Sequence, residues 1–297
     1  EPEFVYKKVK PSKTRANGLP KEKAVPRGRQ RRFFLCQAAA ERVEYRPNAS
    51  QTMASNDKRY AILGDVHSNW EALAAVLEDA ARQGATDYLC VGDLVGYNAD
   101  PAPCLDRLRE IGCLAVRGNH DHYCSNEEPL EDFQPLAASV IAWTRRQLSA
   151  EQTAYLRALP LTRKLEGFTL VHSTLDMPDR WGYVFDALDA ESNFNYQTTA
   201  VCFYGHTHLP IVFERQQRVT RSTYSALRLT VGRKYFINVG SVGQPRDGDP
   251  RAAYVMFEPR AREVRLLRVA YDVRATQERI RRAALPERLA LRLELGK

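Results

Sequence analysis

The chain lacks several features that would assign it to other classes of protein. No stretch approaches the run of about 20 apolar residues that a membrane-spanning helix needs. Its six cysteines form no C-x-x-C pair, and Cys90 and Cys202 fall within apolar runs typical of buried strands. Histidine is scarce, with six among 297 residues. The first two absences predict a soluble protein with no membrane partner and with free thiols in a reducing compartment, the cytoplasm.

An excess of positive charge is also missing from most of the chain. The formal net charge is +8, and residues 1–56 account for all of it, with 13 Lys or Arg against five Asp or Glu. The remaining 241 residues carry 31 charged side chains of each sign. Nucleic-acid binding is therefore an alternative for the basic tail alone.

Residues 1–56 also lack the periodicity of a helix or a strand, and they are rich in Pro, Lys, Arg and Gln. This composition predicts a disordered tail. Met53 stands shortly before the first apolar run, so residues 1–52 are interpreted either as a genuine basic arm or as a non-native extension. The predicted organisation is a tail over residues 1–56, a central domain over 57–272 and a C-terminal helical segment over 273–297.

The scarce histidines are grouped. Five of the six lie in short polar motifs, and His122 is the sixth. Taken singly, each motif is a weak signal, because a lone histidine such as His172 at the end of a strand is more often a structural residue. Their coincidence favours one shared site. The motifs are Asp65-Val66-His67, Gly92-Asp93, Gly118-Asn119-His120-Asp121, Val171-His172-Ser173 and Gly205-His206-Thr207-His208.

Each motif follows an apolar run that is typical of a short buried strand. These runs are residues 60–63, 88–91, 114–116, 168–171 and 201–204. In open α/β sheets, ligands bind beyond the carboxyl ends of the strands. The five motifs are therefore predicted to lie along one edge of a sheet, where they could hold a ligand together.

The order and types of these residues resemble the calcineurin-like metallophosphoesterase family, whose pattern runs D-x-H, G-D, G-N-H-D/E, H and G-H-x-H. The resemblance covers residues 59–272 and is closer to the compact bacterial branch, because Gly96-Tyr97 replaces the D-R of the eukaryotic-type G-D-x-V-D-R-G motif. It implies that His120 is the catalytic histidine, close to the leaving group and bound to no metal. The implied metal ligands are Asp65, His67 and His208 at one ion, Asn119, His172 and His206 at the other, and Asp93 at both.

The hydrolysis of phosphate esters requires residues of these types, independently of the resemblance to the family. Phosphate esters are anionic and repel hydroxide, so a site must supply both positive charge and a nucleophile. Two cations about 3.5 to 4 Å apart lower the pKa of a bridging water and hold the phosphoryl oxygens during attack. Imidazole, carboxylate and amide ligands suit Mn, Fe, Co or Zn, and the sequence does not select among them. His120, with a pKa expected near neutrality, would protonate the departing alkoxide.

The rest of the chain predicts an α/β fold. Helices are predicted from Asn69, as a cap, to Gly84, and over 101–111, 137–148 and 150–159. Strands are predicted over 211–214, 227–231, 235–239, 253–257 and 264–270, and one or two terminal helices broken at Pro286 follow. Early βαβ units followed by many strands predict a two-sheet α/β sandwich flanked by helices, with the metal site at the carboxyl ends of the strands.

A glycine-rich segment over residues 238–251 resembles the N-x-G-S turn beside the metal site of small prokaryotic family members. Such turns expose N–H groups to anions, and Arg246 could contact phosphate. The alternative is a tight loop with surface arginines. Arg117, just before Gly118, is a second candidate for binding substrate.

The combined interpretation is a dinuclear metal-dependent phosphoesterase that hydrolyses phosphomonoesters by attack of a metal-activated hydroxide. Its substrate partner would be a phosphoprotein or a small phosphorylated metabolite. The alternative is a phosphodiesterase acting on cyclic or linear nucleotides. A non-catalytic scaffold of the same fold is less favoured, because such a protein would be expected to lack a ligand or the proton donor. The metals, the substrate and the oligomeric state are left open.

Overall fold

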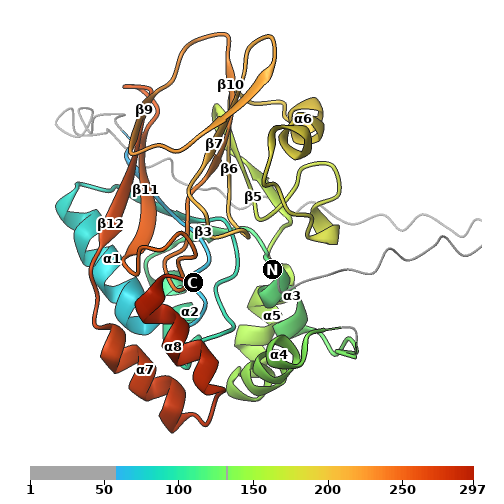
Figure 1. Cartoon of the computed structure of the whole chain (residues 1–297), viewed down its shortest axis with the longest axis vertical. Coiled ribbons are helices and arrows are strands. Elements are labelled where there is room, and N and C mark those ends of the chain that lie inside the picture. The colour runs from blue at the N-terminus through green and yellow to red at the C-terminus, as the bar shows by residue number, and fades with distance from the viewer. Residues whose placement is uncertain (1–57, 132) are drawn as a thin grey trace, which may run out of the picture. The chain divides into compact units, whose positions relative to one another are not determined.

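The computed structural model describes residues 58–131 and 133–297. The basic tail predicted over residues 1–56 lies outside these residues. Within them, twelve strands form two six-stranded sheets, and helices cover the outer faces of both (Figure 1). This is the α/β sandwich that the sequence predicts. In the described part of the chain, no helix is long and apolar enough to cross a membrane, and the five cysteines there are free and buried.

The first sheet carries three of the five motifs. Its first three strands run parallel to one another, and the rest pair antiparallel. The predicted strand over residues 227–231 ends early, at Arg228, because the chain turns at Gly232. In sheet order the strands are β3 (Leu114–Ala115), β2 (Asp87–Cys90), β1 (Tyr60–Leu63), β11 (Ala252–Glu258), β12 (Glu263–Val269) and β9 (Ala226–Arg228).

The second sheet carries the other two motifs. Its strands β5, β6 and β10 are parallel, so β5 and β6 end at the same edge. The short strands β4 and β8 at its two ends were not predicted, because their residues are mostly exposed and polar. In sheet order the strands are β4 (Thr162–Lys164), β5 (Phe168–Val171), β6 (Val201–Tyr204), β10 (Lys234–Asn238), β7 (Val212–Arg215) and β8 (Val219–Ser222).

The two sheets bury a shared apolar core between them. Ile62 and Leu89 of the first sheet belong to the same buried cluster as Phe203 and Ile237 of the second. Phe168 of the second sheet packs edge to face against Phe257 of the first, with ring centroids 5.2 Å apart. Packing of this kind holds two sheets face to face. It therefore brings the motif-bearing edges of both sheets to one place.

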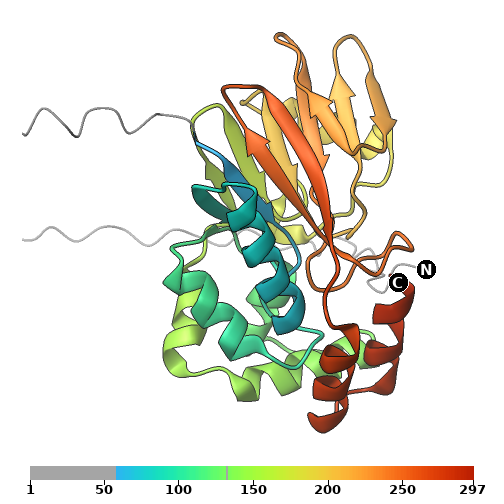
Figure 2. The ribbon, with the colours of Figure 1, turned by 90° about the vertical axis from the view of Figure 1, so that its left-hand side faces the viewer.

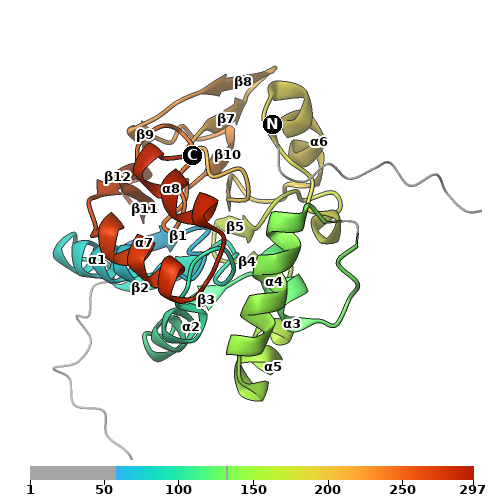
Figure 3. The same ribbon diagram turned by 60° about the horizontal axis from the view of Figure 1, so that its bottom comes forward.

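Helices cover the outer faces. α1 and α2 pack on the first sheet and α6 on the second, and α1 and α6 lie at opposite sides of Figure 1. The predicted caps of two helices are confirmed, since Asn69 accepts from Ala72 N–H and Ser149 from Gln152 N–H, both at 3.1 Å. Figure 3 shows α3, α4 and α5 grouped together. The helices before residue 200 are α1 (Trp70–Arg82), α2 (Pro101–Glu110), α3 (Asn119–Ser125), α4 (Pro135–Gln147), α5 (Ala150–Ala158), the 3-10 turn Pro178–Arg180 and α6 (Ala187–Tyr196).

Two terminal helices, α7 (Val273–Arg282) and α8 (Glu287–Leu295), pack side by side (Figure 2). Pro286 immediately precedes the second helix. Arg279 ties α7 to the body of the protein through ion pairs with Glu71 at 2.6 Å and Asp100 at 2.9 Å. Ile280 and Leu289 share a buried cluster with Tyr97, which lies in the loop after β2. The terminal helices thus pack directly against a loop that leads to the polar site.

Candidate metal centre

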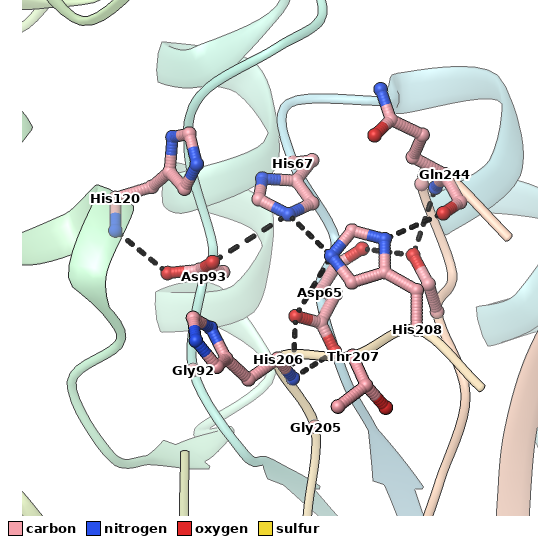
Figure 4. Close-up of polar contacts among 12 residues, drawn as sticks. Asp65, His67, Gly92, Asp93, His120, Gly205, His206, Thr207, His208 and Gln244 are labelled. Atoms are coloured by element: carbon pink, nitrogen blue, oxygen red, sulfur yellow. Dashed lines mark hydrogen bonds and ion pairs between the residues drawn. The ribbon is translucent and has the colours of Figure 1, made fainter. Parts of the chain in front are cut away.

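The five motifs meet at the carboxyl ends of strands from both sheets, and Figure 4 shows residues of four of them. Every one of the eight residues predicted as metal ligands or proton donor is at most 4% exposed. Five of them adopt left-handed backbone conformations, a strained state for non-glycine residues that is common at functional sites. Their φ angles are 50° at Asp65, 47° at His67, 54° at Asp93, 67° at His206 and 60° at His208.

The first group of ligand-type side chains consists of Asp65, His67 and His208. One ligand atom from each lies within 4.8 Å of the others. His208 Nε2 is 3.3 Å from Asp65 Oδ1 and 3.2 Å from His67 Nε2. The His206 backbone N–H donates to Asp65 at 3.0 Å, which fixes the carboxylate. Two imidazoles and a carboxylate thus converge on one point.

The second group consists of Asp93, His172 and His206, which also lie within 4.8 Å of one another. His172 Nε2 is 3.3 Å from Asp93 Oδ2 and 3.1 Å from His206 Nδ1. The amide oxygen of Asn119 is 3.0 Å from the same His172 nitrogen. Asn119, which sequence reasoning assigned to this group, therefore lies in it.

The backbone fixes the protonation of the first pair of histidines. Nδ1 of His67 lies 3.1 Å from the carbonyl of Val95, and Nδ1 of His208 lies 2.6 Å from the carbonyl of Gln244. A carbonyl can only accept, so each Nδ1 carries the proton and each Nε2 presents a lone pair. Burial lowers the pKa of both imidazoles, which favours the neutral form. Two lone pairs therefore face each other at 3.2 Å.

The second pair repeats this arrangement with different ring atoms. His172 Nδ1 lies 3.0 Å from the carbonyl of Val91, and His206 Nε2 lies 2.9 Å from that of Trp181. His172 Nε2 and His206 Nδ1, the two nitrogens that remain for a ligand, consequently lie 3.1 Å apart. Facing lone pairs repel unless a cation or a proton lies between them. The donor set in both groups thus fits a metal ion, since a carbonyl on the far nitrogen is the usual way to orient a metal-binding histidine.

Asp93 lies between the two groups. Its Oδ2 is 3.6 Å from His67 Nε2 and 3.3 Å from His172 Nε2, so one carboxylate faces one histidine of each group. Burial raises the pKa of Asp93, but the positive charge of His172 and its hydrogen bond outweigh this and hold that pKa well below its usual value. Burial lowers the pKa of His172, but the negative charge of Asp93 has the larger effect and raises this pKa to about 9. The centre of the site therefore attracts positive charge.

His120 lies beside this centre. Its backbone N–H donates to Asp93 Oδ1 at 2.8 Å, and its ring lies 4.8 Å from that of His67 and 4.4 Å from that of Tyr97. One ring nitrogen is also within 4.8 Å of ligand atoms of His67 and Asp93. Burial lowers the pKa of His120 to about 4, despite the opposing charge of Asp93. This is lower than the near-neutral value that the sequence suggested.

The two candidate arginines lie in different places. The guanidinium of Arg246 lies 5.6 Å from the centre of the Tyr97 ring and donates to Gln244 Oε1 at 2.9 Å. Its charge contributes to the lowered pKa of His120. Arg117 instead points to the end of α5, where it donates to the carbonyl of Arg157 at 3.2 Å. The structure therefore brings Arg246 to the site and directs Arg117 away from it.

The glycine-rich segment lies beside the site. Ser241 Oγ donates to the carbonyl of Asp65 at 2.8 Å, and Asn238 Nδ2 donates to the carbonyl of Gly205 at 2.6 Å. The Gln244 carbonyl is the one that orients His208. The segment thus supports the loops after β1 and β6, as the resemblance implied.

Asp121 is a functional residue whose role sequence reasoning did not assign. Its carboxylate accepts hydrogen bonds from the backbone N–H groups of Asp93, Leu94 and Gly118 at 2.8 to 3.0 Å, and from Val95 N–H at 3.3 Å. Burial, and then the charge of Asp93, raises the pKa of this carboxyl to about 7. Asp121 therefore joins the loop that carries Asp93 to the one that carries Asn119 and His120. Its place in the G-N-H-D motif was the available signal.

Comparisons with a family model and with known proteins indicate the same superfamily. Residues 59–262 match the model of the calcineurin-like phosphoesterase superfamily domain. The chain is 37% identical over 242 residues to the uncharacterised protein MJ0912 of Methanocaldococcus jannaschii, a match that covers 80% of this chain and 98% of that protein. It is 26% identical over 204 residues to the phosphodiesterase YfcE of Escherichia coli, which covers 65% of this chain and 84% of YfcE.

Among solved structures, a metallophosphoesterase from Sphaerobacter thermophilus superposes with a TM-score of 0.74 and 39% identity. That match covers 82% of this chain and all of the other. The family model and the solved structure both indicate a phosphoesterase, and the buried histidines and carboxylates at the strand ends are groups that could hold a metal ion. The chain belongs to the calcineurin-like phosphoesterase superfamily and is a metal-dependent phosphoesterase.

Proposed function

We propose that the protein is a dinuclear phosphoesterase that hydrolyses phosphomonoesters of a small metabolite or a phosphoprotein. The observation that carries the proposal is the convergence of two pairs of histidine lone pairs, at 3.2 Å and 3.1 Å, with Asp93 between them. Each pair suits one cation. A single carboxylate within 3.6 Å of both pairs suits a bridging ligand.

The proposed ligand sets follow the two groups. One ion would be held by Asp65, His67 and His208, the other by Asn119, His172 and His206, and both by Asp93. When bound, the ions would offset the negative charge of the phosphate and lower the pKa of water. Imidazole-rich ligand sets suit Mn, Fe, Zn or Co.

His120 is the proposed proton donor to the leaving group. It is tied to Asp93 through its backbone at 2.8 Å, and Tyr97 packs against its ring. A low pKa in the buried site favours the neutral imidazole. A bound phosphate brings negative charge next to the ring, which raises the pKa of His120 and favours the protonated form. Substrate binding and charging of the donor would thus occur together.

The position of Arg246 favours a phosphomonoester as the substrate. Its guanidinium lies beside Tyr97 at the edge of the first group, where it adds positive charge to the site. A phosphomonoester dianion benefits more from an additional cation than a diester monoanion does, and Arg can bind phosphate bidentately. The second candidate is a phosphodiesterase acting on nucleotides, which the 26% identity to YfcE favours.

A turnover panel tests the proposal. The full chain would be freed of metal and reloaded with Mn, Fe, Zn or Co, then assayed with p-nitrophenyl phosphate, bis-p-nitrophenyl phosphate, cyclic nucleotides and a phosphopeptide. Hydrolysis of the monoesters alone would support the phosphomonoesterase. Hydrolysis of the diesters alone would favour the phosphodiesterase. Full activity in the metal-free protein would overturn the assigned chemistry.

A further inference from the structure

Three aromatic rings stack from the metal centre to the surface. The ring of Tyr183 stacks on that of His206, with centroids 4.3 Å apart and planes 23° apart. The ring of Phe185 stacks on Tyr183 at 5.3 Å and 8°. Phe185 is 39% exposed. These residues belong to the loop between β5 and α6, at the right of Figure 1.

The core of the protein does not use these two rings. Val184, which stands between them in the chain, is buried in the cluster that α6 forms with the second sheet. Among the described residues, Tyr183 and Phe185 belong to none of the buried apolar clusters. The chain therefore turns Val184 inward, and the two aromatic side chains form the stack on His206.

The loop is attached to the metal centre at a second point. The Trp181 carbonyl accepts from His206 Nε2 at 2.9 Å, and the Trp181 ring lies 6.1 Å from that of His172. Trp181 itself is buried and has a left-handed backbone conformation with φ 54°. The loop is thus held against both histidines of the second group, which fixes the place of Phe185 relative to them.

We propose that Tyr183 and Phe185 form a stacking subsite for a nucleobase, so that the substrate is a nucleoside phosphate. The proposal rests on the proposed phosphoesterase function, since the phosphate would lie at the metal-binding residues. Aromatic side chains stack on the face of any base, with little dependence on its identity. Offset-parallel stacking of the kind already present between Tyr183 and Phe185 is a favoured geometry.

The spacing favours a nucleobase over the ring of a phosphotyrosine. In phosphotyrosine the ring is bonded directly to the ester oxygen, so it stays next to the phosphorus. In a nucleoside phosphate, one ribose separates the base from the phosphate. The Phe185 ring lies beyond that of Tyr183 from the metal-centre residue His206, with centroid steps of 4.3 Å and 5.3 Å. The exposed end of the stack therefore suits a planar group held at a distance from the ester.

Two esters that differ only in the base test the subsite. Adenosine 5′-monophosphate and ribose 5-phosphate have the same primary leaving group, so their ratio of kcat/KM reports binding of the base. We expect a ratio of about 5 to 150 in favour of the nucleotide, the range of one base–aromatic stack. Phe185→Leu keeps an apolar side chain without a ring and should bring the ratio close to one. Leu188→Ala, which removes an 81% exposed side chain outside the stack, is the matched control and should keep the wild-type ratio.

A wild-type ratio near one, or a ratio that Phe185→Leu leaves unchanged, would overturn the subsite. If the enzyme hydrolyses diesters alone, thymidine 5′-p-nitrophenyl phosphate and methyl p-nitrophenyl phosphate form the equivalent pair. A ratio of phosphotyrosine to phosphoserine peptide that falls in Phe185→Leu, with no change for the nucleotide pair, would assign the stack to phosphotyrosine instead.

If the proposed phosphoesterase function is wrong, the same assays give a different result from a failure of the subsite. In that case no ester is hydrolysed with any of the four metals. Calorimetric titration of the Mn-loaded protein with adenosine 5′-monophosphate and ribose 5-phosphate then tests the stack alone. Tighter binding of the nucleotide that is lost in Phe185→Leu would support the subsite, and equal binding of the two would overturn it.

Discussion

The carboxylate of Asp121 accepts a hydrogen bond from the backbone N–H of Asp93 at 2.9 Å, so one acidic residue positions another. The same side chain accepts from the N–H groups of Leu94 and Gly118. We predict that Asp121→Asn will lower kcat/KM by about 10- to 100-fold, because the amide presents N–H groups to backbone donors and displaces the Asp93 loop.

The control for Asp121 is Glu127→Gln, the same change of charge at an exposed position six residues further on. It should keep the wild-type rate. Activity assays and metal analysis of both variants provide the measurement. Wild-type activity in Asp121→Asn would show that the Asp93 loop does not depend on this carboxylate.

Asp93→Asn should disturb both metal ions. One carboxylate faces His67 and His172 at 3.6 Å and 3.3 Å, and the amide that replaces it brings no charge to offset two cations. Asp65→Asn should weaken mainly one ion, since Asp65 lies with His67 and His208. Metal content per chain after dialysis measures the difference. Two tightly held ions in Asp93→Asn would refute the bridging role.

His120→Ala tests whether His120 acts as a proton donor or as a metal ligand. We expect the variant to keep both ions and to hydrolyse alkyl phosphates about 10²- to 10⁴-fold more slowly, while an activated aryl ester loses much less. His206→Ala should instead lose metal and slow both esters alike. Since a His120 ring nitrogen lies within 4.8 Å of ligand atoms of His67 and Asp93, metal analysis is decisive. Loss of metal from His120→Ala would make it a ligand, and His122 would be tested next as the donor.

Gly96→Ala should displace His120 without touching a ligand. A Cβ atom at Gly96 would lie 2.4 Å from Nδ1 of His120, and the backbone there has φ +94°. The matched control is Gly232→Ala, where φ is +86° and no atom lies within 4 Å of the added carbon. Both variants should lose about 1 kcal/mol of unfolding free energy from the left-handed backbone, and Gly96→Ala should lose more, because the buried His120 ring must shift.

The activities of the two glycine variants should differ. Gly96→Ala should resemble His120→Ala, with slow hydrolysis of alkyl esters and retained metal. Gly232→Ala should keep the wild-type rate. Equal activity of the two variants at equal stability would show that the loop at Gly96 adapts and that the position of His120 does not depend on it.

Local signals predicted much of the fold. The caps at Asn69 and Ser149 were readable because each side chain serves a backbone group three residues away. α6 was missed although Asp186 and Asp189 form a capping box, because its exposed face is apolar at Leu188 and lacks clear amphipathic spacing. β8 was missed because its exposed polar residues show no alternation.

The sequence predicted which residues form the candidate site, but it did not predict which histidine nitrogens carry the protons. The motifs placed His67 and His208 at the ends of strands, and the packing of the two sheets brings these ends together. Which nitrogen of His67 carries the proton depends on the carbonyl of Val95, and for His208 on that of Gln244. These partners are backbone atoms 28 and 36 residues away in the chain, so no side-chain pattern records them.

The packing of the terminal helices against Tyr97 has a consequence for how homologues can differ. Tyr97 contacts the rings of His67 and His120, and its other neighbours include Ile280 and Leu289. Those two residues lie beyond residue 262, where the match to the family domain ends. A change of sequence at Ile280 or Leu289, in a part of the chain that carries none of the motifs, would therefore reach His67 and His120 through Tyr97. Homologues that share every motif but differ after residue 272 are expected to differ in turnover rate.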